Sequence, residues 1–214
     1  MKFLSFNCCG LTSPSKKNSF RHLVDSIESD VILLQDMLGD RDGVKSVLET
    51  LYLGWFFEAL DARGRLGGLA MGWRSQDFRY GNLWGFDLSI VMEVFSEELG
   101  RTLSVNSIYG PYHNRVQFWD FLLNNYFIRD KKVIIGVDLN LSLGAVEVWG
   151  AKEISDHMVD FFIHSFVRNG LVDIAPMKFN ATWRNRRSGE DWVAKRLDRF
   201  MVDERVVDSM HLIR

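Results

Sequence analysis

Acidic and amide side chains follow two short apolar runs of this chain. The run Val133–Val137 leads to Asp138 and then to Asn140. A second run, Val31–Gln35, leads to Asp36. Short runs rich in β-branched residues are typical of strands that are buried on both faces. Because ligands of α/β proteins bind at the carboxyl ends of such strands, the two acids suggest a site for a hard cation and a phosphate.

Two more polar residues extend this candidate site. Asn7 lies near the end of a strand-like segment, and Asp198 lies within the strand-like segment Arg196–Phe200. A carboxylate inside a sheet is costly unless it is paired or binds a cation, and Mg²⁺ prefers one or two carboxylates completed by waters and substrate phosphate. The amides of Asn7 and Asn140 can hold a phosphate oxygen or orient a water without adding charge. Each residue alone is more often structural, but together they favour a catalytic site.

The elements that must position these residues follow from apolar periodicity. The strand-like segments are Lys2–Cys8, Val31–Asp36, Gly67–Trp73, Leu88–Phe95, Thr102–Tyr109, Val133–Asp138, Ala181–Arg184 and Arg196–Val202. The helix-like segments are Ser19–Ile27, Gly43–Leu53, Arg115–Asn124 and Ser155–Asn169, the last with Ser155 or Asp156 as its cap and Gly170 as its stop. The first half alternates strand and helix, whereas the middle has consecutive strands. This mixture predicts an α/β fold in which sheets pack face to face with helices outside.

Size and composition are those of an ordinary globular domain. The chain has 214 residues, of which 47% are hydrophobic and 25% are charged, so we expect one domain. No apolar run approaches the roughly 20 residues that span a bilayer, and the N-terminus does not resemble a signal peptide. The neighbouring Cys8 and Cys9 are poorly placed for a disulfide with each other. We therefore expect an intracellular protein without a membrane segment, with the nucleus as one option.

The formal net charge of −2 is not that of a dedicated nucleic-acid-binding protein. Charge can nevertheless be local, and basic residues gather near the C-terminus. They are Arg184, Arg186, Arg187, Lys195, Arg196 and Arg199. A solvated loop and a contact surface for nucleic acid both account for this cluster.

Seven short motifs follow one another in an order that is typical of a known superfamily. They are Ser5–Leu11, Leu34–Asp36, Gly67–Ala70, Tyr109–Pro111, Gly136–Asn140, Thr182–Trp183 and Lys195–Arg199. Their order resembles the endonuclease/exonuclease/phosphatase superfamily, whose fold is DNase I-like. Within it, Tyr109–Pro111 followed by Arg115, Phe118 and Trp119 is most similar to the endonuclease domain of plant LINE-type (non-LTR) retrotransposons. The resemblance covers nearly the whole chain.

The resemblance implies a four-layer α/β sandwich, in which two packed mixed β-sheets are flanked by helices, and Mg²⁺-assisted cleavage of DNA phosphodiesters. The residues it implies are Asn7 and Asp36 for the metal, Tyr109, Asp138, Asn140 and Asp198 for catalysis, and Thr182, Trp183 and Arg184 for contact with DNA. Asp138 and Asn140 would position and activate the attacking water. Tyr109 would hold the scissile phosphate, and Asp198 would support the cluster.

Position 36 departs from the family pattern, which has Glu where this chain has Asp36. The loss of one methylene shortens the reach of the carboxylate by about 1.5 Å. Metal–ligand distances tolerate only about ±0.2 Å. Either the backbone must move or a water must fill the gap.

The C-terminus departs from the pattern as well. The family pattern ends in Ser-Asp-His on a last strand, and no such motif follows Asp198, where His211 is the only histidine. Ser155-Asp156-His157 lies too early in the chain order, so we interpret it as a helix cap. We therefore expect a single domain over residues 1–214 that lacks its last strand. We also expect impaired catalysis, because a missing general acid or base typically costs about 10²–10⁴ in rate.

Two alternatives stay open at this stage. The chain could be a non-catalytic remnant that binds nucleic acid or protein, or an active phosphatase or exonuclease of the same superfamily. Metal-dependent nicking of DNA separates the first alternative from the endonuclease hypothesis, and activity on a small phosphomonoester but not on DNA favours the second. The sequence leaves the oligomeric state undetermined.

Overall fold

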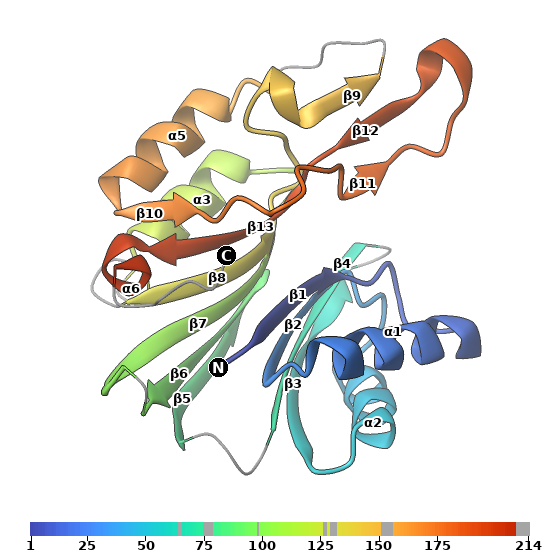
Figure 1. Cartoon of the computed structure of the whole chain (residues 1–214), viewed down its shortest axis with the longest axis vertical. Coiled ribbons are helices and arrows are strands. Elements are labelled where there is room, and N and C mark those ends of the chain that lie inside the picture. The colour runs from blue at the N-terminus through green and yellow to red at the C-terminus, as the bar shows by residue number, and fades with distance from the viewer. Residues whose placement is uncertain are drawn as a thin grey trace.

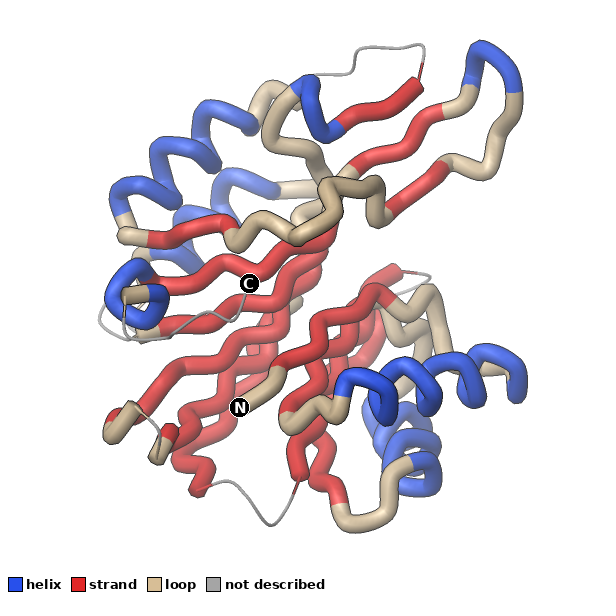
Figure 2. Tube along the Cα trace, viewed as in Figure 1, coloured by secondary structure: helices blue, strands red, loops and turns tan. Residues whose placement is uncertain are grey.

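Two mixed β-sheets lie face to face with helices on their outer sides (Figures 1 and 2). The computed structural model describes residues 1–63, 66–74, 79–97, 99–125, 128, 132–150 and 156–208. The first sheet has the spatial order β1 (Phe3–Asn7), β2 (Val31–Gln35), β4 (Leu66–Arg74) and β3 (Trp55–Arg63). The second has the order β10 (Leu171–Asp173), β13 (Asp198–Asp203), β8 (Val133–Asp138), β7 (Arg101–Tyr109), β6 (Ser89–Ser96) and β5 (Arg79–Phe86).

The helices complete four layers. Helices α1 (Pro14–Ile27) and α2 (Arg41–Leu51) cover the first sheet, and α3 (Arg115–Leu123) and α5 (Val159–Arg168) cover the second (Figure 1). The four-layer α/β sandwich expected from the sequence is thus confirmed. The remaining elements are a small sheet of β11 (Trp183–Arg184), β12 (Val193–Lys195) and β9 (Val148–Gly150), the short helix α6 (Glu204–Val207) and two 3₁₀ turns, η1 (Ala145–Glu147) and η2 (Gly189–Asp191). No helix in the described ranges has both the length and the hydropathy to cross a bilayer.

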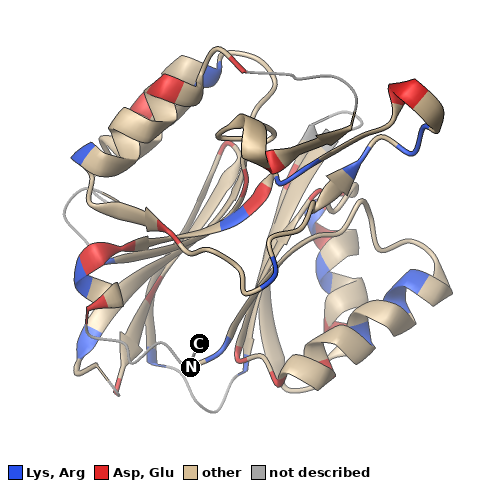
Figure 3. Ribbon diagram, turned by 45° about the horizontal axis from the view of Figure 1, so that its top comes forward, with Lys and Arg blue, Asp and Glu red and all other residues tan. Residues whose placement is uncertain are grey.

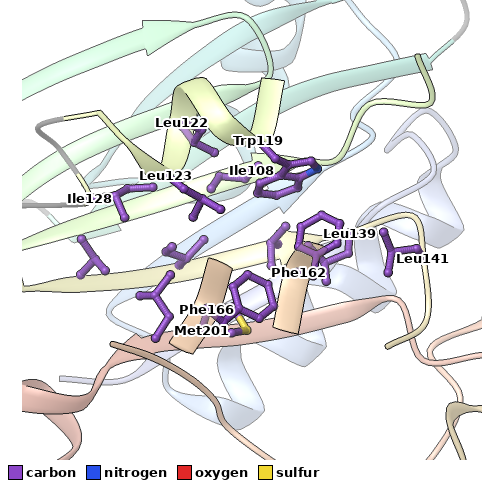
Figure 4. Packing of buried hydrophobic residues seen from close by; sticks show 14 of the residues in the cluster. Ile108, Trp119, Leu122, Leu123, Ile128, Leu139, Leu141, Phe162, Phe166 and Met201 are labelled. Carbon is purple, nitrogen blue, oxygen red and sulfur yellow. The ribbon is translucent and has the colours of Figure 1, made fainter. Parts of the chain in front are cut away.

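Apolar cores fill the spaces between the layers. Side chains of both sheets, among them Leu33, Met71, Ile90 and Met92, form the central core. On the outer side of the second sheet, Trp119 of α3 packs edge-on against Phe162 of α5 (Figure 4). Every residue of β2 and of β8 is buried, as expected for strands covered on both faces.

The two sheets are in close contact where Gly136 faces the first sheet. A Cβ atom on Gly136 would lie 2.6 Å from Leu33 Cδ1 and 2.7 Å from Ser5 Oγ, so no larger residue fits without movement. Beside this contact, Gln35 Nε2 donates to Ser107 Oγ at 3.2 Å and to the Gly136 carbonyl at 3.4 Å. These buried hydrogen bonds link the sheets next to the candidate site.

Five strands were absent from the sequence-based expectations, namely β3, β5, β9, β10 and β12. β5 is largely exposed and contains Gly81, Asn82 and Gly85, so it lacks the apolar alternation that marks a strand. β3 contains Glu58, Asp61 and several helix-favouring residues, and it forms because it pairs with β4. The predicted strand Arg196–Val202 was also displaced, since β12 ends at Lys195 and β13 begins at Asp198. Of the predicted strand Ala181–Arg184, only Trp183–Arg184 is β11.

The helix ends required corrections as well. α1 begins at Pro14, because Ser13 accepts the Lys16 N–H as its cap and Pro14 suits the first turn. α5 begins at Val159 rather than Ser155, and Asp156 is not its cap residue. Instead, Asp156 Oδ1 accepts the Met158 N–H at 2.9 Å and Oδ2 pairs with Arg115 at 2.8 Å. Ser155 and His211 lie outside the described residues.

Candidate active site

The ends of β1 and β8 meet where the two sheets face each other, and there Asn7 contacts Asp138. Asn7 Nδ2 donates a hydrogen bond of 2.6 Å to Asp138 Oδ2. The backbone N–H of Asn140 donates to Asp138 Oδ1 at 2.8 Å. Both carboxylate oxygens are therefore held, one by Asn7 of β1 and one by the backbone of the loop after β8.

Two neighbouring strands place Asp198 and Tyr109 on either side of Asp138. In the second sheet Asp138 pairs in register with Asp198 of β13 and with Tyr109 of β7. Asp36 follows β2, and β2 pairs in register with β1 up to Asn7 and Gln35. The structure thus brings the sequence-derived metal and catalytic candidates to one edge of the sandwich.

Asn140 is fixed by the loop that follows β7. Its Nδ2 donates to the Gly110 carbonyl at 2.6 Å, and its Oδ1 accepts the hydroxyl of Tyr112 at 2.9 Å. The Gly110 N–H donates to the Asp138 carbonyl at 2.7 Å. A Cβ on Gly110 would lie 2.6 Å from the Leu139 carbonyl oxygen, so this close approach of the two backbones requires glycine.

Tyr112 was not among the sequence-based candidates. It follows Pro111 in an irregular loop, where no periodicity marks it, and only its contact with Asn140 identifies it. Burial raises the pKa values of both Tyr109 and Tyr112, so both hydroxyls stay protonated and can donate hydrogen bonds. The Tyr112 hydroxyl donates its one hydrogen to Asn140 Oδ1, so its role is to hold the Asn140 amide.

Burial and the charge of Asp198 raise the pKa of Asp138 to about 7. The hydrogen bonds from Asn140 and Asn7 oppose this rise, because they favour the ionised form. Burial also raises the pKa of Asp198, against the opposing hydrogen bond of Thr182. A carboxyl with a pKa near 7 can gain and lose a proton at neutral pH, as a general base must.

Asp36 has a left-handed backbone conformation, with φ +55°, and one of its oxygens is already engaged. Its Oδ1 accepts the Gly67 N–H at 3.0 Å. Burial raises its pKa, and this hydrogen bond and the charge of Lys16 lower it. Asp36 is thus a half-buried acid beside Asn7, whose Oδ1 accepts the Cys9 N–H at 3.3 Å.

The donor set suits a water-rich divalent cation better than a closed protein cage. Within the described residues, no group of three or more His, Cys, Asp or Glu is arranged to hold a metal ion. Yet Asp36, Asp138 and Asp198 also form no salt bridge with any described Lys or Arg. Mg²⁺ commonly binds through one or two carboxylates plus waters and phosphate. Asp36 and the Asn7 amide oxygen fit that requirement.

Next to Asp198, buried arginines form a separate network with acids. Arg199 pairs with Glu147 and, at 2.6 Å, with Asp173. Arg196 pairs with the same acids at 2.8 and 2.6 Å, and both arginines are 3% exposed. The predicted basic cluster is therefore two groups: Arg196 and Arg199 are internal, and they are not available to a nucleic acid.

The other basic residues lie on the hairpin of β11 and β12, which extends from the sandwich. Figure 3 shows basic residues along this hairpin and acidic residues at its tip, where η2 lies. Arg184 is exposed, and Trp183 is 41% exposed. Thr182 has a structural role, because its Oγ1 accepts the N–H groups of Leu197 at 2.9 Å and Asp198 at 3.1 Å.

Comparisons with known proteins give no match to this sequence among protein families or curated proteins. Solved structures, in contrast, match it over nearly its whole length. An AP endonuclease from Archaeoglobus fulgidus is 14% identical, with a TM-score of 0.73 over 97% of this chain and 88% of that one. The fold is DNase I-like.

Two further structures with the DNase I-like fold extend the comparison. The endonuclease domain of TRAS1, a telomere-specific non-LTR retrotransposon, is 14% identical, with a TM-score of 0.67 over 96% of this chain and 86% of that domain. The 3′ phosphatase NExo from Neisseria, bound to a product DNA hairpin, is 17% identical, with a TM-score of 0.67 over 97% and 88%. At these identities the likeness shows the shared fold.

Proposed function

We propose that this chain is a divalent-metal-dependent phosphodiesterase that nicks DNA, related to the endonuclease domains of LINE-type retrotransposons. One observation carries the proposal: Asn7, Asp138 and Asn140 form a hydrogen-bonded unit whose acid has a pKa of about 7. Structures of DNA-processing enzymes and of a retrotransposon endonuclease domain share the fold and support the substrate class.

In the proposed reaction, Asp138 accepts a proton from the attacking water. Asn7 and the Asn140 backbone hold the two oxygens of Asp138, which fixes the direction from which the water is deprotonated. The hydroxyl of Tyr109 donates to a non-bridging oxygen of the phosphate, and the hydroxyl of Tyr112 holds Asn140 in place. A bound Mg²⁺ would neutralise phosphate charge and polarise the phosphorus–oxygen bonds.

For the metal we propose Asp36 and the amide oxygen of Asn7, completed by waters. For the DNA we propose Trp183 and Arg184 as the contact residues, because an exposed aromatic ring and a guanidinium on one hairpin suit bases and phosphates. Thr182 acts on this surface indirectly, since its hydroxyl fixes the start of β13.

We expect weak catalysis from this chain. Asp198 Oδ1 is buried and accepts no hydrogen bond from a described residue, so this oxygen lacks the support that both oxygens of Asp138 have. Asp36 is also one methylene shorter than the acid of the family pattern. Both features reduce transition-state stabilisation without removing the proposed base, Asp138.

Plasmid nicking tests the proposal. With Mg²⁺ at pH 7.5, the chain should convert supercoiled DNA slowly to the open circle. Asp138→Asn should lower that rate by about 10²-fold or more, because it removes the general base. Asp160→Asn, an exposed acid on α5, is the matched control and should leave the rate unchanged. Equal nicking by Asp138→Asn and the unmodified chain would refute the proposed mechanism.

The two alternatives give different results in the same assay. Release of phosphate from a small phosphomonoester without nicking would indicate a phosphatase. DNA binding with no metal-dependent turnover of either substrate would indicate a non-catalytic nucleic-acid-binding domain. Rapid turnover lost in Asp138→Asn would keep the endonuclease assignment and refute the weak catalysis.

Asp36→Glu tests the metal assignment. The longer side chain should restore reach toward the cation, so nicking should rise by about tenfold or more and require less Mg²⁺. Asp40→Glu, at the cap of α2, adds the same methylene away from the site. It should change neither the nicking rate nor the Mg²⁺ requirement. A lower rate in Asp36→Glu would show that Asp36 is not a metal ligand.

A further inference from the structure

Helix α3 packs on the sheet with one apolar face, and a second side of the helix combines aromatic rings with amides. Trp119, Leu122 and Leu123 point into the core against the second sheet and α5 (Figure 4). Another stripe consists of positions 114, 117, 118 and 121, which share one side of a helix at spacings of three and four. Phe121 in this stripe is 58% exposed, so burial in the core does not account for it.

This stripe forms one wall of a cavity of about 300 Å³. Its lining residues are Asp87, Leu88, Pro111, His113, Asn114, Gln117, Phe118 and Phe121. This volume lies at the lower end of the roughly 300–1,000 Å³ that is typical of small-molecule sites, so it is large enough for one nucleobase. Phe86 contacts Phe121 edge-on, with ring centroids 6.1 Å apart, and this contact fixes the Phe121 ring.

The cavity adjoins the candidate active site through the loop after β7. Pro111 and His113, which line it, flank Tyr112, and Tyr112 donates to Asn140. Pro111 also follows Gly110, whose carbonyl accepts the amide of Asn140. A DNA strand whose phosphate lies at Asn140 would therefore carry a neighbouring base toward the cavity.

The chemistry of the lining is amphipathic. Phe118 and Phe121 provide aromatic surface, on which bases stack irrespective of sequence. Asn114 and Gln117 provide amides that match the donor and acceptor edge of a base. Neither amide has a protein hydrogen-bond partner in the part of the chain that the structure describes, and Asn114 does not cap α3.

We propose that this cavity binds one unstacked nucleobase of the DNA, next to the phosphodiester that is cleaved. The proposal rests on the proposed function, because it takes DNA as the substrate and Asn140 as a marker of the phosphate position. The base stacks on the ring of Phe121, and the amides of Asn114 and Gln117 contact its edge. The protein then selects sites where a base leaves the helix at low cost.

Fluorescence anisotropy with two labelled duplexes tests the proposal, one fully paired and one with a single-base bulge, with Ca²⁺ in place of Mg²⁺. The unmodified chain should bind the bulged duplex about fivefold or more tighter. Phe121→Ala should remove this preference for the bulged duplex. Val116→Ala, exposed on the same helix but outside the stripe, is the matched control and should keep the preference.

A trinucleotide containing 2-aminopurine provides a second readout that does not require duplex binding. Its fluorescence should fall on binding to the unmodified chain, and Phe121→Ala should abolish this fall. Equal affinity for both duplexes without quenching would overturn the cavity proposal and leave the endonuclease proposal standing. Quenching that depends on Phe121, in a protein that does not bind either duplex, would support the base-binding cavity and overturn the endonuclease proposal. No binding to any probe would overturn both.

Discussion

Two clusters of buried charge lie at adjacent positions of β13, and they are balanced differently. Arg199 and Arg196 face two acids, Glu147 and Asp173, so their charges cancel within the network. Asp198 instead faces another acid, Asp138, and neither forms a salt bridge with a described cation. The first arrangement offsets the cost of burying charge, whereas the second leaves that cost in place and raises the pKa of both acids.

The comparison shows how one strand combines structural and reactive groups. In the balanced network, each arginine and acid keeps its partner ionised. The resulting ion pairs hold the side chains in one arrangement. An unbalanced pair of acids holds its protons to a higher pH than isolated carboxyls do, and once ionised it attracts a cation. The burial of a charged group therefore indicates little about function. Whether an opposite charge is paired with that group indicates much more.

The largest expected effect is the loss of a balancing cation. Arg199→Met should lower the free energy of unfolding by about 3–5 kcal/mol, because Glu147 and Asp173 keep their buried charges without this partner. Urea unfolding at pH 7 measures it. Lys2→Met, which removes an exposed pair with Glu28, is the control and should leave the free energy of unfolding nearly unchanged. A comparably small cost for Arg199→Met would remove the distinction between the two clusters.

The next effect is the pH dependence of the unbalanced pair. The folded pKa of Asp138 is about 7 and its ordinary value is 3.8, so the unfolded chain releases this proton first. The stabilising contribution is therefore complete below pH 4 and is lost as the pH rises through 7, by about 2–4 kcal/mol. Urea unfolding from pH 4 to pH 8.5 should show this fall, and Asp138→Asn should flatten it. A fall of equal size in the variant would assign it to other groups.

A cation should then reverse part of this loss. At pH 8, Mg²⁺ at ten to a hundred times its dissociation constant should stabilise the chain by about 1–3 kcal/mol. A rise in melting temperature measures it, and the rise should shrink at pH 5, where the carboxyls hold protons. Asp36→Asn should abolish the rise, whereas Asp160→Asn should keep it. An unchanged rise in Asp36→Asn would place the cation elsewhere.

The smallest effect concerns the positioning of Asp198. Thr182→Val removes the oxygen that accepts the N–H groups of Leu197 and Asp198, so stability should fall by about 1–2 kcal/mol. Thr182→Ser keeps the hydroxyl and should stay within about 0.5 kcal/mol of the unmodified chain. Thermal unfolding of both variants decides this, and equal melting temperatures would show that β13 begins correctly without Thr182.

Much of the fold could be predicted because strands buried on both faces have a recognisable sequence pattern, a continuous apolar run. β2 and β8 have continuous apolar runs, and their ends located Asp36, Asp138 and Asn140. Strand β5 was missed because it lies at the edge of its sheet with most side chains in solvent. Its pairing with β6, a neighbour in space, determines its structure more than its own residues do.

The sequence could suggest which residues belong to the candidate site, but not which hydrogen bonds join them. Strand ends and family order gave the acids and amides, yet the hydrogen bond from Asn7 to Asp138 joins two sheets and depends on their packing. Tyr112 lies in a loop, where its side chain obeys no period. The sequence also did not distinguish Arg196 and Arg199, which are buried, from Arg184, which is exposed.

Because of Gly136, the geometry of the candidate site depends on the distance between the two sheets. Asn7 and Asp138 belong to different sheets, and the bond of 2.6 Å between them exists only at one separation of the layers. Gly136 allows that separation, because even a methyl group there would meet Leu33 and Ser5. The interlayer distance is thus part of the reactive geometry, and a residue without a side chain determines it. A substitution buried in the middle of the protein would therefore have the consequences of a substitution at the site itself.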